Sequence, residues 1–96
     1  MREYELMLIV DAGLEERDAK AVVDRYLGTL KAHGGNVTAV DHWGKRRFSY
    51  EIRHMNEGWY AVATLEASPE MVDELSRVLS LADQVIRHKI IRPAAA

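Results

Sequence analysis

The sequence predicts an α+β fold in which a four-stranded antiparallel sheet carries two helices on one face. Three observations support this prediction. Apolar and polar residues alternate with the period of a strand, two stretches have the apolar stripe of an amphipathic helix, and glycine or proline stands at helix ends. The predicted order is β-α-β-β-α-β. Two right-handed split β-α-β units in that order form the ferredoxin-like fold, which by itself assigns no function.

The first half of the chain contains a strand, a helix and an unusually long second strand. Residues 4–10 form a strand because their even positions are all apolar. A helix follows from about Glu15, with acidic residues in its first turns that suit the positive end of the helix dipole, and Gly34-Gly35 ends it. The second strand is predicted over residues 36–52, with Gly44 as a bulge or bend in its middle.

The second half supplies the other two strands and the second helix. Residues 53–58 are polar and are predicted to form the turn of a hairpin that leads into a third strand over residues 59–65. Ser68-Pro69 is a strong helix start, because the hydroxyl can cap the helix and proline suits its first position. The last strand is predicted over residues 85–92, and Pro93 ends it.

Length and composition place the chain among small intracellular domains. Its 96 residues suffice for a single core, so we predict one domain over residues 1–93 and a short tail over residues 94–96. The absence of cysteine excludes disulfides, thiolate catalysis and zinc-thiolate sites. No apolar run approaches the roughly 20 residues of a membrane span, and the N-terminus does not resemble a signal peptide. We therefore expect a cytoplasmic, soluble protein.

A run of three cations, Lys45-Arg46-Arg47, lies inside the second predicted strand, although the formal net charge of the chain is −2. The residues after it alternate between apolar and polar, so this strand has a face to bury and can hold the cations in place. Fixed positive charge attracts a phosphate backbone, and Trp43 and Tyr50 nearby could stack on bases. Cations on an edge strand also discourage aggregation, but that role requires only one or two of them. The run therefore favours contact with nucleic acid.

The distribution of charge predicts two different sides of the molecule. Acidic residues gather in the predicted helices, whereas the predicted strands contain the basic residues Lys45, Arg46, Arg47, Arg87, Lys89 and Arg92. If the helices cover one face, the molecule has an acidic helical side and a basic sheet side, which would orient an anionic polymer.

The face of the sheet away from the helices is predicted to be partly apolar. Alternation directs one set of residues toward the helices: Leu6, Leu8, Val10, Trp59, Ala61, Ala63, Leu65, Ile86 and Ile90. The outer face then combines Met7, Ile9, Val62 and Ile91 with Tyr60, Arg87 and Lys89. Single exposed apolar residues are common, but a larger set is typical of a docking surface. The residues predicted to bind a protein partner are Met7, Ile9, Trp43, Tyr50, Tyr60, Val62 and Ile91.

No pattern in the sequence indicates catalysis or metal binding. The four histidines lack the spacing of metal ligands, and His88, on the inward side of the last strand, is expected to be a structural histidine with a hydrogen-bond partner. There is no phosphate-binding glycine loop and no nucleophile motif. We predict a protein that is not an enzyme and that has no cofactor, no metal and no small-molecule substrate.

Three segments in order resemble one known family. They are the start, Met1-Arg2-Glu3-Tyr4-Glu5, the central segment from Trp43 to Ile52, which is similar to a W-G-x-R-x-L-A-Y-x-I signature, and Asp83-Gln84-Val85-Ile86-Arg87. Together they resemble the bacterial small-subunit ribosomal protein S6 family over nearly the whole chain. The family usually has proline where this chain has Glu51, so the strand edge there is expected to pair differently.

The resemblance implies a structural protein of the small ribosomal subunit. It would bind the central domain of small-subunit ribosomal RNA as a heterodimer with ribosomal protein S18. The RNA contacts of the family would correspond here to Arg2, Tyr4, Lys45, Arg46, Arg47, Arg87, Lys89 and Arg92.

Three other functions share this topology. An RRM-like single-strand binder would need aromatic residues on both central strands, and the first strand offers only Tyr4. An acylphosphatase-like enzyme would need a phosphate-binding loop after the first strand, where Asp11-Ala12-Gly13 is acidic instead. A small-ligand regulatory domain that acts as a dimer is the third possibility.

Overall fold

The computed structural model describes residues 1–52 and 55–93, but not the side chains of residues 49–52. The elements follow the predicted order: β1 (Arg2–Asp11), α1 (Glu16–Ala32), β2 (Asn36–Ile52), β3 (Met55–Ala67), α2 (Pro69–Leu81) and β4 (Val85–Ile91). The bounds of β2 agree with the prediction, whereas β1 and β3 extend beyond it. The predicted tail over residues 94–96 lies outside the described residues.

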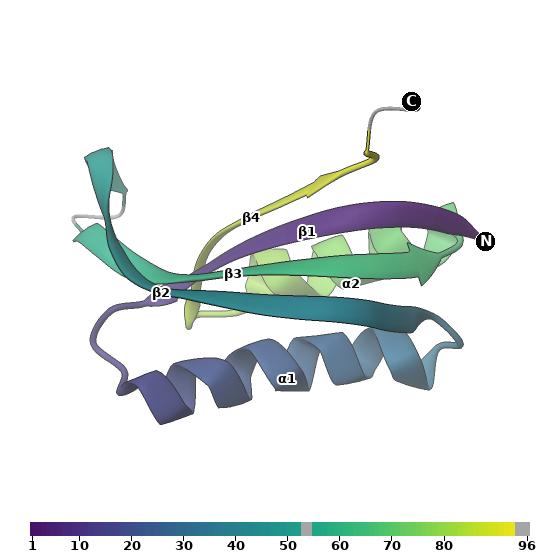
Figure 1. Cartoon of the computed structure of the whole chain (residues 1–96), viewed down its shortest axis with the longest axis horizontal. Helices are drawn as coiled ribbons and strands as arrows, with labels where there is room; N and C mark the ends of the chain where they lie inside the picture. The colour runs from purple at the N-terminus through teal and green to yellow at the C-terminus, as the bar shows by residue number, and fades with distance from the viewer. Residues whose placement is uncertain (53–54, 94–96) are drawn as a thin grey trace.

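The four strands form one antiparallel sheet in the order β2-β3-β1-β4, so β2 and β4 are the edge strands. Both helices lie against the same face, and no helix or strand of the described residues covers the opposite face, here called the open face (Figure 1). This arrangement confirms the predicted ferredoxin-like fold.

The helix ends follow the local chemistry of the sequence. Beyond α1, Gly34 adopts a φ of 95°, and the Gly34 and Gly35 amides donate to the carbonyls of Lys31 and Leu30 at 3.1 and 3.0 Å. Glycine suits this left-handed position because it has no Cβ. At the start of α2, the Ser68 hydroxyl accepts a hydrogen bond from the Met71 amide at 3.3 Å, as the predicted cap requires.

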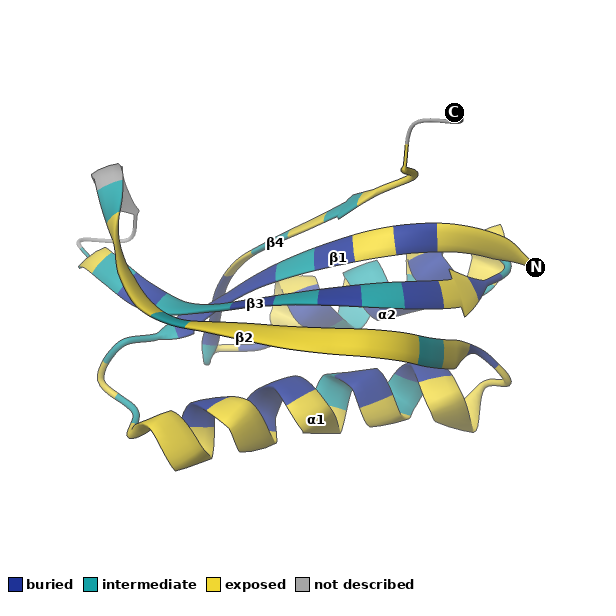
Figure 2. Cartoon of the chain, viewed as in Figure 1, coloured by how far each residue is buried: buried dark blue, intermediate teal, exposed yellow. Residues whose placement is uncertain are grey.

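The core lies between the helices and the inward face of the sheet (Figure 2). The residues that alternation directed inward on β1 and β3 are in it: Leu6, Leu8, Val10, Ala61, Ala63 and Leu65, with Trp59 packed at its margin. Leu27 and Leu30 of α1 and Leu75 and Leu79 of α2 cover them. The indole of Trp59 donates to the Leu14 carbonyl at 2.9 Å, which joins β3 to the loop after β1.

The strands differ from the prediction in two places. The third strand begins at Met55 instead of residue 59, because Glu57 and Gly58 pair with Arg47 and Arg46 of β2 and so continue the ladder through the predicted turn. On β4, Ile86 is buried, and Val85 joins the core cluster although it was not predicted to do so. The register between β1 and β4 shifts at Ile9/Val10, which places Val85 opposite the inward residue Val10.

The β2–β3 hairpin bends at Gly44, as predicted. Gly44 has a φ of 85°, and the pairing of β2 with β3 shifts between His42 and Gly44. Beyond this point the hairpin runs past the end of the other strands and curves away from the helices (Figure 1). The cationic run Lys45-Arg46-Arg47 follows the bend directly and lies on this projecting part.

Candidate functional site

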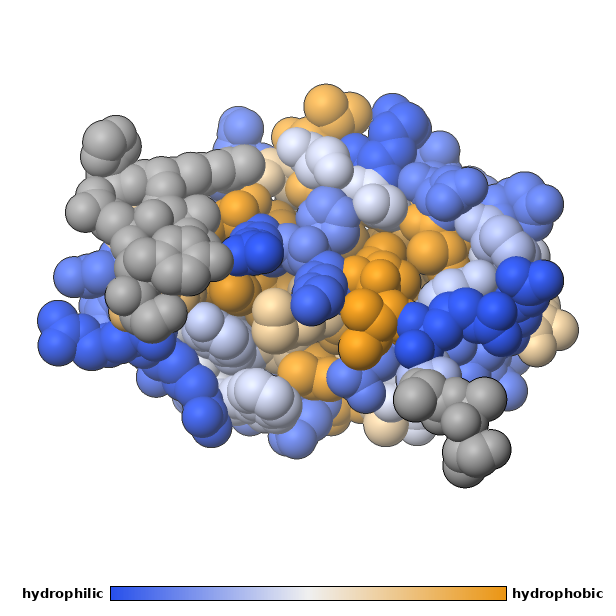
Figure 3. Space-filling view, turned by 90° about the horizontal axis from the view of Figure 1, so that it is seen from above, coloured by the Kyte–Doolittle hydropathy of each residue, from blue (hydrophilic) through white to orange (hydrophobic). Residues whose placement is uncertain are grey.

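The open face is organised in rows across the strands. Antiparallel pairing sets outward residues opposite one another: Thr64, Glu5 and Ile91 in one row, Val62, Met7 and Lys89 in the next, and Tyr60, Ile9 and Arg87 in the third. Figure 3 looks onto this face and shows apolar side chains along its middle with hydrophilic groups on either side. The open face therefore has apolar side chains in its middle, with basic residues of β2 and β4 on either side.

An aromatic cluster occupies the part of the open face near the hairpin. Trp43 and Tyr60 are stacked, with ring centroids 6.4 Å apart and planes 2° from parallel. Phe48 packs against Tyr60 at a tilt of 51°, with centroids 6.0 Å apart. The Asp41 carboxylate accepts a hydrogen bond from Trp43 Nε1 at 3.0 Å. These contacts hold Trp43 in place although 43% of its surface remains exposed.

The cations of the run point to opposite faces of the hairpin. The Arg46 guanidinium lies 5.2 Å from the ring centre of Trp43, on the open face. Lys45 Nζ lies 4.9 Å from the ring centre of Trp59, which belongs to the inward face. Strand alternation puts Arg47 on the same side as Lys45. The run therefore offers positive charge on two sides of the hairpin instead of one continuous track.

All three cations of the run are exposed. Among the side chains that the structure describes, no ion pair within 4.0 Å involves Lys45, Arg46 or Arg47; the pairs found are Arg17–Glu15, Arg17–Asp18 and Arg77–Glu74. Among the described side chains, none of these three cations is in an ion pair that would have to be broken before an anionic ligand binds.

The other predicted basic residues are spread along the sheet. Arg87 and Lys89 are exposed on β4, on the open face. Arg87 lies three strand spacings from Gly44 of β2 in the same row, or roughly 14 Å. Arg2 and Arg92 are exposed near the opposite end of the sheet from the hairpin. Only Arg46, Arg87 and Lys89 share the open face with the apolar centre.

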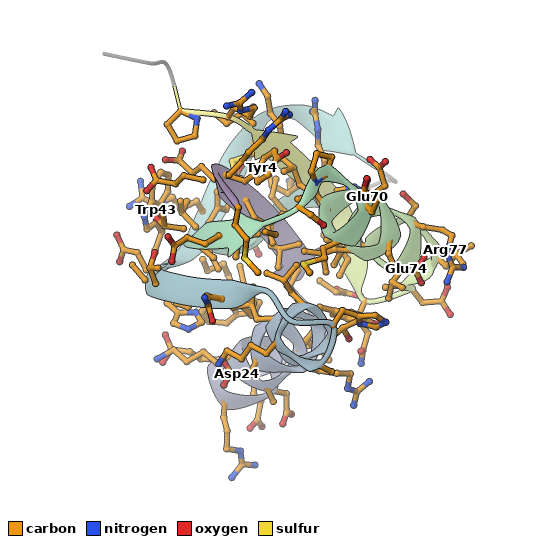
Figure 4. All side chains as sticks on the ribbon, turned by 90° about the vertical axis from the view of Figure 1, so that its right-hand side faces the viewer. Tyr4, Asp24, Trp43, Glu70, Glu74 and Arg77 are labelled. Carbon is orange, nitrogen blue, oxygen red and sulfur yellow. The ribbon has the colours of Figure 1, made fainter. Side chains whose placement is uncertain are left out.

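Two of the predicted contact residues are not accessible. Tyr4 is 7% exposed and belongs to the core beneath the sheet, so its side chain is not open to RNA (Figure 4). Ile9 lies on the open face between Tyr60 and Arg87 of the neighbouring strands, but it is only 2% exposed. Met7, Val62 and Tyr60 are half-buried, and Ile91 is 44% exposed. The side chain of Tyr50 lies outside the described residues.

His88 takes the place predicted for it, on the inward side of β4. Its Nε2 lies 2.9 Å from Ser76 Oγ of α2, and burial lowers the pKa of the imidazole. The neutral form is favoured because desolvation penalises the charged one. The prediction of a structural histidine with a polar partner is confirmed.

The predicted acidic helical side is only partly present. The helix α1 contains Arg17, Lys20, Arg25 and Lys31 beside its acidic residues Glu16, Asp18 and Asp24. The bases of this helix therefore offset its acids. The excess of negative charge on the helical side comes from α2, so the steering field expected from whole-helix charge is weak.

Sequence reasoning missed the supporting residues Asp41 and Phe48 of the open face. Asp41 contacts the ring of Trp43, and Phe48 contacts Tyr60, a residue of another strand. The spacing of Asp41 two residues before Trp43 is visible in the sequence and is compatible with a shared face, but the hydrogen bond between their side chains is not evident from it.

Comparisons with known proteins agree on one family. The family model described as ribosomal protein S6 matches residues 3–92. The small ribosomal subunit protein bS6 of Beutenbergia cavernae is 48% identical over 95 residues, and that of Acidothermus cellulolyticus is 46% identical over 95 residues. Each alignment covers 99% of both chains.

Solved structures agree with the sequence comparisons. The crystal structure of 30S ribosomal protein S6 from Thermotoga maritima has a TM-score of 0.89 at 28% identity, and the match covers 96% of this chain and 87% of that one. The C-terminal domain of the MgtC protein from Mycobacterium tuberculosis, with a TM-score of 0.63 at 12% identity, is similar in fold alone. Neither helix in the described part of the chain is both long and apolar enough to cross a membrane.

Proposed function

Because the chain belongs to the ribosomal protein S6 family, and is therefore a structural protein of the small subunit of the cytoplasmic ribosome, we propose that it binds the central domain of small-subunit ribosomal RNA as a heterodimer with ribosomal protein S18. Residues 1–93 would act as one domain in this complex. Its relatives are ribosomal proteins, not enzymes, and the acylphosphatase-like alternative is set aside.

The observation that carries the proposal is the uncovered sheet face with exposed cations on both edge strands. Arg46 on β2 and Arg87 and Lys89 on β4 flank an apolar centre that contains Met7 and Val62. Arginine and lysine neutralise phosphates and release counterions, which supplies affinity without base recognition. The half-buried apolar centre suits the side chains of a protein partner.

The chemistry of the side chains divides them between contact with RNA and contact with S18. We assign phosphate contact to the exposed basic residues Arg2, Lys45, Arg46, Arg47, Arg87, Lys89 and Arg92. S18 would contact Met7, Val62, Tyr60, Trp43 and Ile91, and Tyr50 is retained as a prediction from the sequence. Tyr4 and Ile9 leave these sets because they are buried.

An RRM-like mode of binding fits the open face less well. Such domains stack bases on aromatic residues of the two central strands. The central strands here are β3 and β1, and none of the outward residues of β1, which include Glu5, Met7 and Ile9, is aromatic. The single aromatic residue on the outward side of this pair, Tyr60, is already stacked on Trp43.

The proposal is tested by RNA binding of the S18 heterodimer at several salt concentrations. Replacing Arg46 and Arg47 together with alanine should weaken binding about 10-fold near 0.1 M salt and reduce the slope of log affinity against log salt by about 1 to 2. A filter-binding titration with a central-domain RNA fragment measures both quantities. Gel filtration beforehand shows whether the variant still pairs with S18.

The matched control removes two arginines from the helical side. Arg17→Ala with Arg25→Ala changes the net charge equally, on the exposed face of α1. This control should bind RNA nearly as tightly as the unchanged protein. Equal loss in both variants would indicate an effect of net charge alone, and an unchanged affinity and slope for the hairpin variant would refute its contact with RNA.

A further inference from the structure

Trp43 makes three contacts, with Asp41, Tyr60 and the guanidinium of Arg46. Asp41 accepts the hydrogen bond of Trp43 Nε1 at 3.0 Å, Trp43 is stacked on Tyr60, and Arg46 lies 5.2 Å above the ring centre of Trp43. Figure 4 shows Trp43 on the side of the sheet away from the helices. We propose that Asp41 and Trp43 are positioning residues that hold Arg46 in place for an RNA phosphate, an inference that rests on the function proposed above.

The bulge in β2 makes this arrangement possible. In a regular strand, residues 43 and 46 would point to opposite faces because their separation is odd. The register shift between His42 and Gly44, with the positive φ of Gly44, places Trp43 and Arg46 on the same face. A bulge that redirects a side chain in this way is a recurrent feature of binding sites.

Preorganisation is the physical benefit of the ring. A free arginine side chain samples many rotamers, and ordering it against a phosphate costs entropy. Packing the guanidinium on an aromatic face restricts that freedom before RNA arrives and leaves its N–H groups at the edge of the plane available to phosphate. The ring must itself be fixed for this to work, and Tyr60 and Asp41 fix it from two directions.

Removing Asp41 should change RNA affinity in opposite directions, depending on whether Asp41 acts through its charge or by positioning Trp43. A carboxylate near a phosphate-binding arginine repels RNA, so if Asp41 acted only through its charge, its removal would tighten binding. Among the described residues no ion pair joins Asp41 to Arg46, and the carboxylate contacts the indole instead. If Asp41 positions Trp43, its removal weakens binding even though it removes a negative charge.

The experiment measures binding of the S18 heterodimer to the central-domain RNA fragment across a salt series. Asp41→Ala should weaken binding about 2- to 5-fold, the range expected for losing one exposed cation–π arrangement. Asp41→Asn keeps an acceptor oxygen for Nε1 and should bind at least as tightly as the unchanged protein. Glu5→Ala removes another carboxylate from the open face and should not weaken binding.

A double-variant cycle separates this inference from the proposed function. With Arg46→Ala already present, Asp41→Ala should no longer weaken binding, because the arginine that it positions is gone. Tighter binding by Asp41→Ala alone, or a loss that adds to that of Arg46→Ala, would overturn the positioning role and leave RNA binding by Arg46 intact. No loss from Arg46→Ala itself would overturn both.

Trp43→Leu is the companion variant. It removes the ring and should reproduce the loss seen with Asp41→Ala, without a further loss when the two are combined. If the shorter side chain disturbs the hairpin, circular dichroism and S18 pairing will show it. The Asp41 variants retain the indole and still decide whether Asp41 positions Arg46. Full affinity of a folded Trp43→Leu heterodimer would overturn the proposal.

Discussion

The two faces of the sheet use the same alternation of residues for different purposes. On β1, Leu6 is completely buried beneath the helices, whereas its neighbour Met7 is half-buried on the open face. On β3, Leu65 is completely buried and Tyr60 is half-buried against Trp43. The inward residues of β1 and β3 that lie in the core are apolar, whereas the open face mixes apolar, aromatic and cationic side chains.

This difference separates stability from binding within single strands. Inward residues contribute free energy mainly by leaving water, and a fully buried leucine contributes about 2 kcal/mol or more in this way. Open-face residues remain partly wet, so they contribute less to folding and keep surface for a partner. Substitutions on the inward face should therefore change the free energy of unfolding most, and those on the open face should change binding most.

The largest expected effect tests this separation with two adjacent residues. Leu6→Ala leaves a cavity at the centre of the core and should lower the free energy of unfolding by about 3 kcal/mol. Met7→Ala should lower it by only about 1 kcal/mol, because its side chain is already half in water. Urea unfolding of both variants at neutral pH measures the difference. Similar losses would show that the open face is as tightly packed as the core.

The fold could be predicted because its signals are local. Alternation identified the inward residues of β1 and β3, and Ser68-Pro69 and Gly34-Gly35 identified the helix ends. The place of Val85 in the core could not be predicted, because it depends on a register shift in the pairing between β1 and β4. The early start of β3 was missed for a similar reason, since its first residues are polar and are held by the neighbouring strand.

The site was predictable in its location and less so in its geometry. Resemblance assigned Tyr4 to RNA contact, although its even position already grouped it with Leu6 and Leu8, and the structure buries it with them. The split of Lys45 and Arg46 onto opposite faces follows from strand alternation. The contact of Trp43 with Arg46 depends on the bulge in β2. Gly44 indicated a bulge in the sequence, but only the pairing register shows on which face of the sheet Trp43 lies.

The next prediction concerns a closely packed part of the open face, around Gly58. A Cβ added at Gly58 would lie 2.6 Å from Ile9 Cγ2 and 3.0 Å from the Val10 carbonyl oxygen. Because the second contact is backbone, it cannot move away cheaply. Gly58→Ala should therefore lower the free energy of unfolding by about 1 to 3 kcal/mol, as overpacking does.

The matched control for Gly58 lies in α1. A Cβ added at Gly28 meets nothing within 4 Å, and alanine is the better helix former. Gly28→Ala should raise the free energy of unfolding by about 0.4 to 1 kcal/mol. If both substitutions shift the urea midpoint in the same direction, the close approach of β1 to β3 at Gly58 does not limit side-chain size there.

The smallest expected effect sharpens the comparison at the rim of the inward face, where His88 meets Ser76. Burial holds the folded pKa of His88 below its ordinary value of about 6.5, so the unfolded chain takes up this proton first as the pH falls. The unfolded state then binds more protons than the folded one, and stability decreases as the pH falls. The contribution of neutral His88 to the free energy of unfolding is complete above about pH 7.5. It begins to decrease near the ordinary pKa and is lost below the lowered folded pKa. Urea unfolding at pH 7.5 and 5.5 should show a steeper loss for the unchanged protein than for His88→Gln. Equal losses would mean that the proton on His88 is not coupled to the packing of β4 against α2.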